Sequence, residues 1–223
     1  MQEHSLQIGT DSLRTLFRFR PLTARGVALK DQTLASNAAS SHEDVLNDIF
    51  QLFHDRGDSM YAGEPVSQTE HALQAAVFAE KECSSSAMIT AALLHDIGHL
   101  LSKHPEDCAE SGIDDQHERL GAKWLSAHFG PDVVEPIRLH VPAKRYLCAV
   151  NPDYLRNLSS ASLTSLKLQG GPFTTEEVRA FDALPHAQHA LRLRAWDEAA
   201  KVENMELPDL IHFRAHLETC LKS

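Results

Sequence analysis

From Ser41 onward, apolar residues recur along the chain at the three- and four-residue spacings of amphipathic helices. Ser41 and Asp44 form a capping box ahead of an apolar stripe that runs from Val45 to Phe53, and Gly57 is expected to end this helix. No segment alternates apolar and polar residues with the period of two that is typical of a half-buried strand. The pattern therefore predicts an all-α fold.

Capping residues, glycines and prolines predict the other helix boundaries. A second capping box, Ser67 and Glu70, places His71 in the first turn or two of a helix. The helix that opens at Pro131 is expected to stop at Pro142, because proline removes a backbone donor. The remaining helices are expected at 85–101, after a cap formed by Asp115 and Glu118, from Asn151-Pro152, at 159–168, after a cap formed by Thr174 and Glu177, at 186–202 and at 207–221.

The N-terminal 40 residues differ from the rest of the chain. Their periodicity is weak, and they end in an Ala/Ser-rich stretch at 34–40. We expect residues 1–40 to be a poorly ordered extension, with a short helix around 12–17. Residues 41–223 are then one helical domain, which is long enough to bury a core.

The most informative stretch follows the run Met88–Leu94, which is apolar on every side and predicts a buried helix. It ends in His95-Asp96-Ile97-Gly98-His99. A buried imidazole and carboxylate need partners away from water, and a metal ion satisfies both. Because adjacent helical side chains point about 100° apart, one metal site can take both only near the helix end.

The composition excludes some classes of binding partner and favours others. The 223 residues carry a net charge of −10, which argues against nucleic acid or an anionic membrane as the main partner. The four cysteines are scattered and there is no signal-peptide pattern, which is typical of reduced thiols in a cytoplasmic protein. Fourteen histidines are unusual and indicate metal binding.

Six histidines and aspartates are candidate ligands, in the order H, HD, H, H, D along the chain. They are nitrogen and oxygen donors and exceed the three or four that one metal needs, which favours two first-row transition ions with Asp96 as the bridge. Six other histidines are expected to be ordinary core or surface residues: His54, His128, His186, His189, His212 and His216. The candidate ligands are His71, His95, Asp96, His117, His140 and Asp197.

This ligand order resembles the dinuclear branch of the HD-domain superfamily, which includes phosphohydrolases and mixed-valent di-iron oxygenases. The surrounding sequence is similar to the phosphonate-cleaving oxygenases of the PhnZ and TmpB type over about residues 58–202. The matching segments are Tyr61-Ala-Gly-Glu64-Pro-Val-Ser-Gln68-Thr-Glu-His71, His95-Asp-Ile-Gly-His99, His140-Val-Pro-Ala-Lys144-Arg-Tyr-Leu, Ser162-Leu-Thr-Ser165-Leu-Lys-Leu-Gln169-Gly-Gly-Pro172 and Arg194-Ala-Trp-Asp197.

The resemblance implies an HD-type helical bundle with a mixed-valent Fe(II)/Fe(III) pair in its core and O2 as co-substrate. One iron is then held by His71, His95, Asp96 and Asp197, and the other by Asp96, His117 and His140. The implied reaction removes the hydrogen from the hydroxyl-bearing carbon of a 1-hydroxyphosphonate and breaks the carbon–phosphorus bond. The products are a carboxylate and phosphate. An upstream hydroxylase would supply the 1-hydroxy substrate.

The chain also contains groups that suit a phosphonate. Lys144 follows His140 by four residues and Arg194 precedes Asp197 by three, spacings that place both members of a helical pair on one face. His99, four residues after His95, is a further candidate donor, and the hydroxyls of Ser162 and Ser165 are candidate neutral donors. For Arg194 the alternative is a surface ion pair with Glu198, and for Lys144 the argument is weakened by Pro142.

In the resembling family the loop before the first histidine is a lid. Its tyrosine, here Tyr61, can ligate the iron when substrate is absent, and its glutamate, here Glu64, meets the amino end of the substrate. A carboxylate attracts a cationic nitrogen that lies opposite it. The alternative is that this loop is simply an exposed turn.

Several functions are compatible with this sequence. The first is a di-iron dioxygenase that cleaves a 1-hydroxy-2-(amino or trimethylammonio)ethylphosphonate to glycine or glycine betaine and phosphate. The second is an HD phosphohydrolase of nucleotides or other phosphate esters, which uses a metal-activated hydroxide. A signalling HD module usually lacks ligands that are present here. Inositol oxygenase shares the metal pattern but gives no reason for Lys144 and Arg194.

Overall fold

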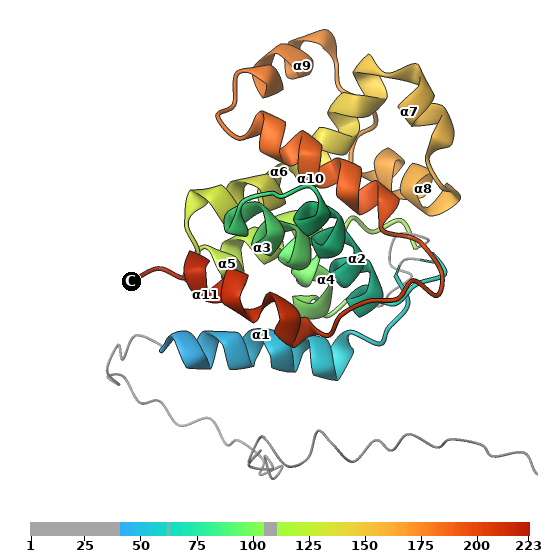
Figure 1. Cartoon of the computed structure of the whole chain (residues 1–223). Helices are drawn as coiled ribbons and strands as arrows, with labels where there is room; N and C mark the ends of the chain where they lie inside the picture. The colour runs from blue at the N-terminus through green and yellow to red at the C-terminus, as the bar shows by residue number, and fades with distance from the viewer. Residues whose placement is uncertain (1–40, 62, 105–110) are drawn as a thin grey trace, which may run out of the picture. The chain divides into compact units, whose positions relative to one another are not determined.

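The computed structural model describes residues 41–61, 63–104 and 111–223, and this part of the chain is helical with no strand, as the sequence predicts. Within these residues, the β-type backbone pairing is limited to two isolated antiparallel bridges, Met60 with Ser67 and Phe129 with Leu221. Figure 1 shows the arrangement of the elements. They are α1 (His42–Arg56), α2 (Gln68–Lys81), α3 (Ser86–Leu94), α4 (Ile97–Leu101), α5 (His117–Leu125), α6 (Pro131–Val150), α7 (Pro152–Asn157), α8 (Ser160–Leu168), α9 (Thr175–Asp182), α10 (Ala187–Ala199), the 3-10 turn η1 (Leu210–Phe213) and α11 (Arg214–Cys220).

Some expectations fall outside the described residues. These are the extension at 1–40 with its short helix at 12–17, and Cys108. The other three cysteines, Cys83, Cys148 and Cys220, are free thiols. Within the described ranges, no helix combines the length and the apolar character that crossing a bilayer requires.

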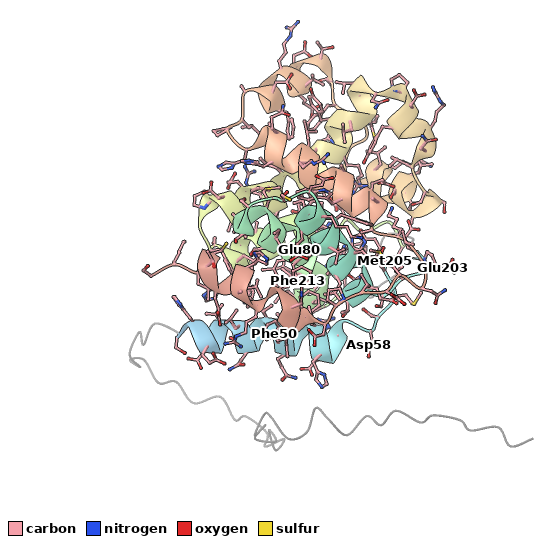
Figure 2. The ribbon with its side chains drawn as sticks, in the orientation of Figure 1. Phe50, Asp58, Glu80, Glu203, Met205 and Phe213 are labelled. Atoms are coloured by element: carbon pink, nitrogen blue, oxygen red, sulfur yellow. The ribbon has the colours of Figure 1, made fainter. Side chains whose placement is uncertain are left out.

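The main hydrophobic core surrounds α3, whose residues from Met88 to Leu94 are all buried. Helix α10 packs on α6 and α2, and α6 packs in turn on α3 and α5. In Figure 1, α1 and α11 lie on one side of this centre, and α7, α8 and α9 lie on the opposite side, beyond α10. Figure 2 shows Phe213 of η1 near Phe50 of α1, where the closing segment meets the first helix. The core therefore forms around the segment that leads to His95-Asp96.

The helix starts at three predicted capping boxes are confirmed. The side chains of Ser41, Ser67 and Thr174 each accept from the backbone N–H three residues on, and the acidic residue at that position returns a bond to the cap. The short helix after Asn151 and the helix after Ser159 are confirmed as α7 and α8. Local capping chemistry thus fixes these boundaries.

The expectation that Pro142 interrupts its helix is wrong. Helix α6 continues through Pro136 and Pro142 to Val150 without a break. It is buried on both sides of Pro142, against α10, α5 and α3, and this packing outweighs the lost backbone bond. The four-residue spacing of His140 and Lys144 therefore lies within one helix.

The predicted helix at 85–101 is divided in two. Helix α3 ends at Leu94 and α4 begins at Ile97, so His95 and Asp96 form the junction. Asp96 has φ −104° and ψ 14°, outside the helical range. This break allows two consecutive side chains to face one site.

The cap of α5, the end of α10 and the start of the closing segment differ from expectation. Helix α5 begins at His117 after Gln116, which has a left-handed φ of 50° and gives no side-chain cap. The Asp115 carboxylate accepts from the backbone N–H of His117 at 3.3 Å and also binds the rings of His99 and His117. Helix α10 ends at Ala199 rather than at 202, and the closing segment begins as the 3-10 turn η1.

We predict that Gly98→Ala destabilises the fold by about 1–3 kcal/mol, the usual scale for overpacking. A Cβ on Gly98 would lie 2.0 Å from the carbonyl oxygen of His117, so α4 and α5 would have to separate. Urea unfolding followed by circular dichroism measures the change. Gly130→Ala is the matched control, because its Cβ would meet nothing within 4 Å. Equal stability of the two variants would contradict the close approach of α4 and α5.

Candidate metal centre and adjoining cavity

Four helices and the junction between two others bring the six candidate ligands together. Each of the six is buried, although they are spread over 127 residue numbers, from 71 to 197. Helix packing around α3 thus gathers residues that are distant in sequence. His71 comes from α2, His95 and Asp96 from the junction of α3 and α4, His117 from the start of α5, His140 from α6 and Asp197 from α10.

The first half of the centre contains His71, His95 and Asp197. The Nε2 atoms of His71 and His95 are 3.0 Å apart. Oδ1 of Asp197 lies 3.5 Å from Nε2 of His71 and 3.9 Å from Nε2 of His95. Three ligand atoms therefore converge on one point.

The second half contains Asp96, His117 and His140. The Nε2 atoms of His117 and His140 are 3.2 Å apart. Oδ1 of Asp96 lies 3.4 Å from Nε2 of His117 and 3.3 Å from Nε2 of His140. The other oxygen of Asp96, Oδ2, faces the first half, 3.4 Å from Nε2 of His95. Asp96 thus offers one oxygen to each half, as a bridging carboxylate would.

The Nδ1 atoms of the four histidine rings are all occupied by acceptors. The rings of His71, His95 and His140 contact the backbone carbonyl oxygens of residues 200, 92 and 137 at 2.7–2.8 Å. The ring of His117 contacts Asp115 at 2.9 Å. Since an acceptor at Nδ1 fixes the proton there, Nε2 is left as a lone pair. Lone pairs that face each other at about 3 Å need a cation between them.

The two buried aspartates of the centre also indicate a bound cation. Burial alone would raise the pKa of the Asp96 carboxyl, but the adjacent imidazoles of His95 and His117 hold this pKa well below its usual range. Burial also acts to raise the pKa of Asp197, and the neighbouring charge of Arg194 holds it well below the usual range. Among the described residues, neither oxygen of Asp96 nor Oδ1 of Asp197 has a hydrogen-bond donor. Buried, ionised and unpaired oxygens next to imidazole nitrogens fit a metal site.

Arg194 is placed differently from a free phosphate-binding residue. It is buried, and its guanidinium binds Oδ2 of Asp197 and also Glu198. Its Nε donates to the Tyr154 hydroxyl at 2.7 Å. Arg194 therefore holds Asp197 with Oδ1 turned to the histidines. The alternative pairing with Glu198 does occur, but inside the protein rather than on its surface.

A cavity of about 800 Å³ adjoins the centre and is lined by His117, His140 and the predicted substrate residues. Lys144 is buried there and donates to Oγ of Ser165 at 2.9 Å. Burial, followed by the positive charge of Arg194, lowers the pKa of Lys144 to about 8. The predicted substrate residues that line this cavity are Glu64, His99, Lys144, Ser162, Ser165 and Arg194.

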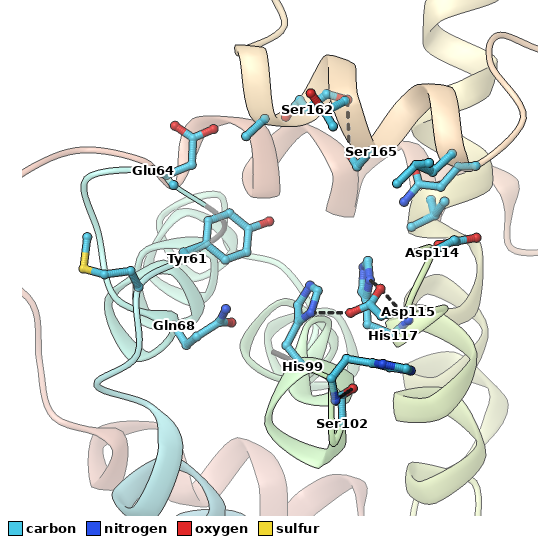
Figure 3. A pocket seen from close by; sticks show the side chains of 18 of the residues that line it. Tyr61, Glu64, Gln68, His99, Ser102, Asp114, Asp115, His117, Ser162 and Ser165 are labelled. Atoms are coloured by element: carbon cyan, nitrogen blue, oxygen red, sulfur yellow. Dashed lines mark hydrogen bonds and ion pairs between the residues drawn. The ribbon is translucent and has the colours of Figure 1, made fainter. Parts of the chain in front are cut away.

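In the loop before α2, the side chains of Tyr61 and Glu64 are partly buried, whereas Gly63 and Pro65 are exposed. The ring of Tyr61 stacks on that of His71, with centroids 3.7 Å apart and planes at 13°. Burial and the negative charge of Asp96 raise the pKa of Tyr61 well above its usual value. Figure 3 shows Tyr61 over the cavity and the Glu64 carboxylate turned toward α8 and Ser162. The loop thus covers the site from the α2 side.

Sequence reasoning missed the role of Asp115. Its two oxygens bind Nδ1 of His99 at 2.7 Å and Nδ1 of His117 at 2.9 Å (Figure 3). It thereby orients a candidate ligand and a cavity residue together. An aspartate two residues before a histidine was the available signal, but its position before a helix suggested a cap. Among the histidines expected to be ordinary, His212 pairs with Glu80 on the surface.

Comparison with known proteins agrees with this geometry. Residues 69–180 match the HD domain family. The chain is 49% identical to a hydroxymethylphosphonate dioxygenase of Gimesia maris, over 78% of this chain and 87% of that protein. It is 44% identical to the [1-hydroxy-2-(trimethylamino)ethyl]phosphonate dioxygenase (glycine-betaine-forming) of Leisingera caerulea, over 76% of this chain and 86% of that protein. The chain therefore belongs to the HD-domain family, in the group that includes these phosphonate dioxygenases.

Proposed function

We propose that this protein is an oxygen-dependent phosphonate dioxygenase that cleaves the carbon–phosphorus bond of a 1-hydroxylated phosphonate. The observation that carries the proposal is the paired ligand set with Asp96 facing both halves, beside a cavity that contains a buried lysine. The names of the two relatives support the reaction class. We propose residues 41–223 as the catalytic domain and 1–40 as an extension to it.

The proposed ligands of one iron are His71, His95, Asp96 and Asp197, and those of the other are Asp96, His117 and His140. Nitrogen and oxygen donors without a thiolate suit iron. When bound, a mixed-valent iron pair supplies redox chemistry with dioxygen and Lewis acidity for the substrate oxygens. Arg194 keeps Asp197 oriented, and Asp115 keeps His117 oriented, so that each ligand presents a fixed atom.

The residues of the cavity then bind and orient the substrate. The Lys144 ammonium attracts the phosphonate, and the hydroxyls of Ser165 and Ser162 provide neutral contacts. His99 presents its ring beside Asp115 at the same wall. Tyr61 covers His71 and excludes water from that face of the centre. Glu64 bounds the end of the cavity that would receive the rest of the substrate.

The substrate class includes 1-hydroxy-2-aminoethylphosphonate, its N-trimethyl analogue and hydroxymethylphosphonate. The products are phosphate and the corresponding carboxylate, which is glycine, glycine betaine or formate. Because the carbon next to phosphorus must already carry a hydroxyl, we propose an upstream hydroxylase as the source of the substrate. We propose a cytoplasmic location, where free thiols such as those of Cys83 and Cys220 persist.

The first prediction of this proposal concerns the reaction itself. The iron-loaded enzyme is expected to consume oxygen and release phosphate together from 1-hydroxylated phosphonates, and to release none under strict anaerobiosis. An oxygen electrode and a phosphate assay measure both. The alternative, an HD phosphohydrolase, would release phosphate from an ester without oxygen and would leave the carbon–phosphorus bond intact. Oxygen-independent release would therefore overturn the proposal.

The second prediction concerns the ligands. Asp96→Ala is expected to remove metal from both halves, because this residue serves both, whereas His117→Ala should leave the half formed by His71, His95 and Asp197. Metal analysis and Mössbauer spectroscopy after anaerobic loading with iron measure the content and identity. His212→Ala is the control, since this histidine binds Glu80 on the surface. Unchanged content in His117→Ala would contradict the second half.

The third prediction concerns pH. Lys144 has a pKa of about 8, so its charge is present below that pH and is lost as the pH rises through it. We expect kcat/KM to fall above about pH 8, because the neutral amine no longer attracts the phosphonate. Lys144→Arg should move the fall to higher pH, and Lys144→Met should lower kcat/KM by about tenfold or more at pH 7. A profile of Lys144→Arg identical to that of the native enzyme would exclude this origin.

A further inference from the structure

Lys201 lies just beyond the end of α10 and is surrounded by acceptors. Its Nζ lies 3.3 Å from Oε1 of Glu64, 3.1 Å from Oε1 of Glu198 and 3.2 Å from Oγ of Ser162. The side chains of Lys201 and Glu64 are each only 13% exposed. Glu64 is held further by the hydroxyl of Ser159, at 2.5 Å. This ion pair is therefore partly buried and has a defined geometry.

The pair borders the substrate cavity. Glu64 and Ser162 both line it, and Figure 3 shows the Glu64 carboxylate facing the helix that carries Ser162. Lys144, the residue proposed to bind the phosphonate, donates to Ser165, one turn along the same helix. Lys201 thus lies at the end of the cavity where the part of the substrate beyond the hydroxyl-bearing carbon would extend.

Charges alternate from this end to the metal centre. Glu64 pairs with Lys201, Lys201 with Glu198, Glu198 with Arg194, and Arg194 with Asp197. Each of the two glutamates is thereby balanced by a cation of the protein itself. A partly buried carboxylate that loses its cation is destabilised, and one that gains a second cation must share it. The negative charges of both glutamates are therefore neutralised before any substrate enters the cavity.

We propose that Lys201 determines the substrate class, by occupying the position in which Glu64 would otherwise receive the cation of the substrate. The inference rests on the proposed dioxygenase function. A hydroxyphosphonate without a positive charge leaves the pair of Lys201 and Glu64 intact. A substrate with an ammonium group at the second carbon has to displace Lys201 from Glu64. The site therefore prefers hydroxyphosphonates that carry no positively charged group, of which hydroxymethylphosphonate is the smallest.

The test compares kcat/KM for hydroxymethylphosphonate and for 1-hydroxy-2-aminoethylphosphonate, both measured as phosphate release. The native enzyme is expected to favour the first. In Lys201→Met the ratio should move by about tenfold or more toward the amino substrate, whose cation then replaces that of Lys201. Lys201→Arg, which keeps the charge, should retain the native preference. Lys167→Met is the matched control, because Lys167 is an exposed lysine of α8 that does not line the cavity.

A double variant tests the mechanism. Lys201→Met leaves Glu64 without its partner, and Glu64→Gln removes that unpaired charge. The double variant should therefore regain kcat/KM for hydroxymethylphosphonate relative to Lys201→Met alone. A loss caused merely by disturbed packing would not be rescued in this way. Circular dichroism and iron content check that each variant is folded and loaded.

Two results would overturn the inference while leaving the dioxygenase function intact. One is a native preference for the amino substrate, which needs no variant to observe. The other is an unchanged ratio in folded, iron-loaded Lys201→Met. If the native enzyme releases phosphate from neither phosphonate, the proposed function itself fails. The three outcomes are distinguishable in one set of assays.

Discussion

The interruption between α3 and α4 is the constraint on which the rest of the site depends. Two consecutive residues of one helix diverge by about 100°, so His95 and Asp96 can face a common centre only if the helix stops there. The helix does stop, and Asp96 then presents one oxygen to each half of the ligand set. The break requires support, which comes from the close contact of Gly98 with the backbone of His117. The same glycine that supports the junction thus fixes a ligand of the second half.

Compensation of buried charge is the second constraint. Asp96, Asp197, Glu64 and Glu198 are carboxylates that lie in or beside the interior. Those near the centre are surrounded by imidazoles, and those farther away are paired with cations of the protein. Arg194 belongs to both groups, because it binds Asp197 on one side and Glu198 on the other. Such a network restricts each side chain to one arrangement, which keeps ligand atoms fixed before a substrate arrives.

The walls of the cavity are formed by segments that are far apart in the sequence. The loop before α2 covers one side, α8 forms another, and α6 supplies the buried lysine. Lys144 reaches its place because α6 is continuous through Pro142. Had the helix ended there, Lys144 would no longer share a face with His140. Packing of α6 against three neighbours thus has a direct consequence for substrate binding.

The sequence by itself determined the features that depend on local chemistry. Capping boxes such as Ser41 with Asp44 fixed helix starts, because the bonds span only three residues. The apolar run before His95 identified a buried helix, and the order of histidines and aspartates identified a candidate set of ligands whose metal-binding role stays a prediction.

Tertiary structure decided the features that depend on contacts between distant segments. It kept α6 intact through Pro142, because burial outweighed a local preference. It placed the Asp115 carboxylate against two imidazoles in addition to the backbone N–H of His117, because His99 lies beside it in space. It also brought Lys201 to Glu64, a pair 137 positions apart that no local pattern records. Spacing along a helix reveals which residues share a face, but only the packing of helices decides which charge meets which.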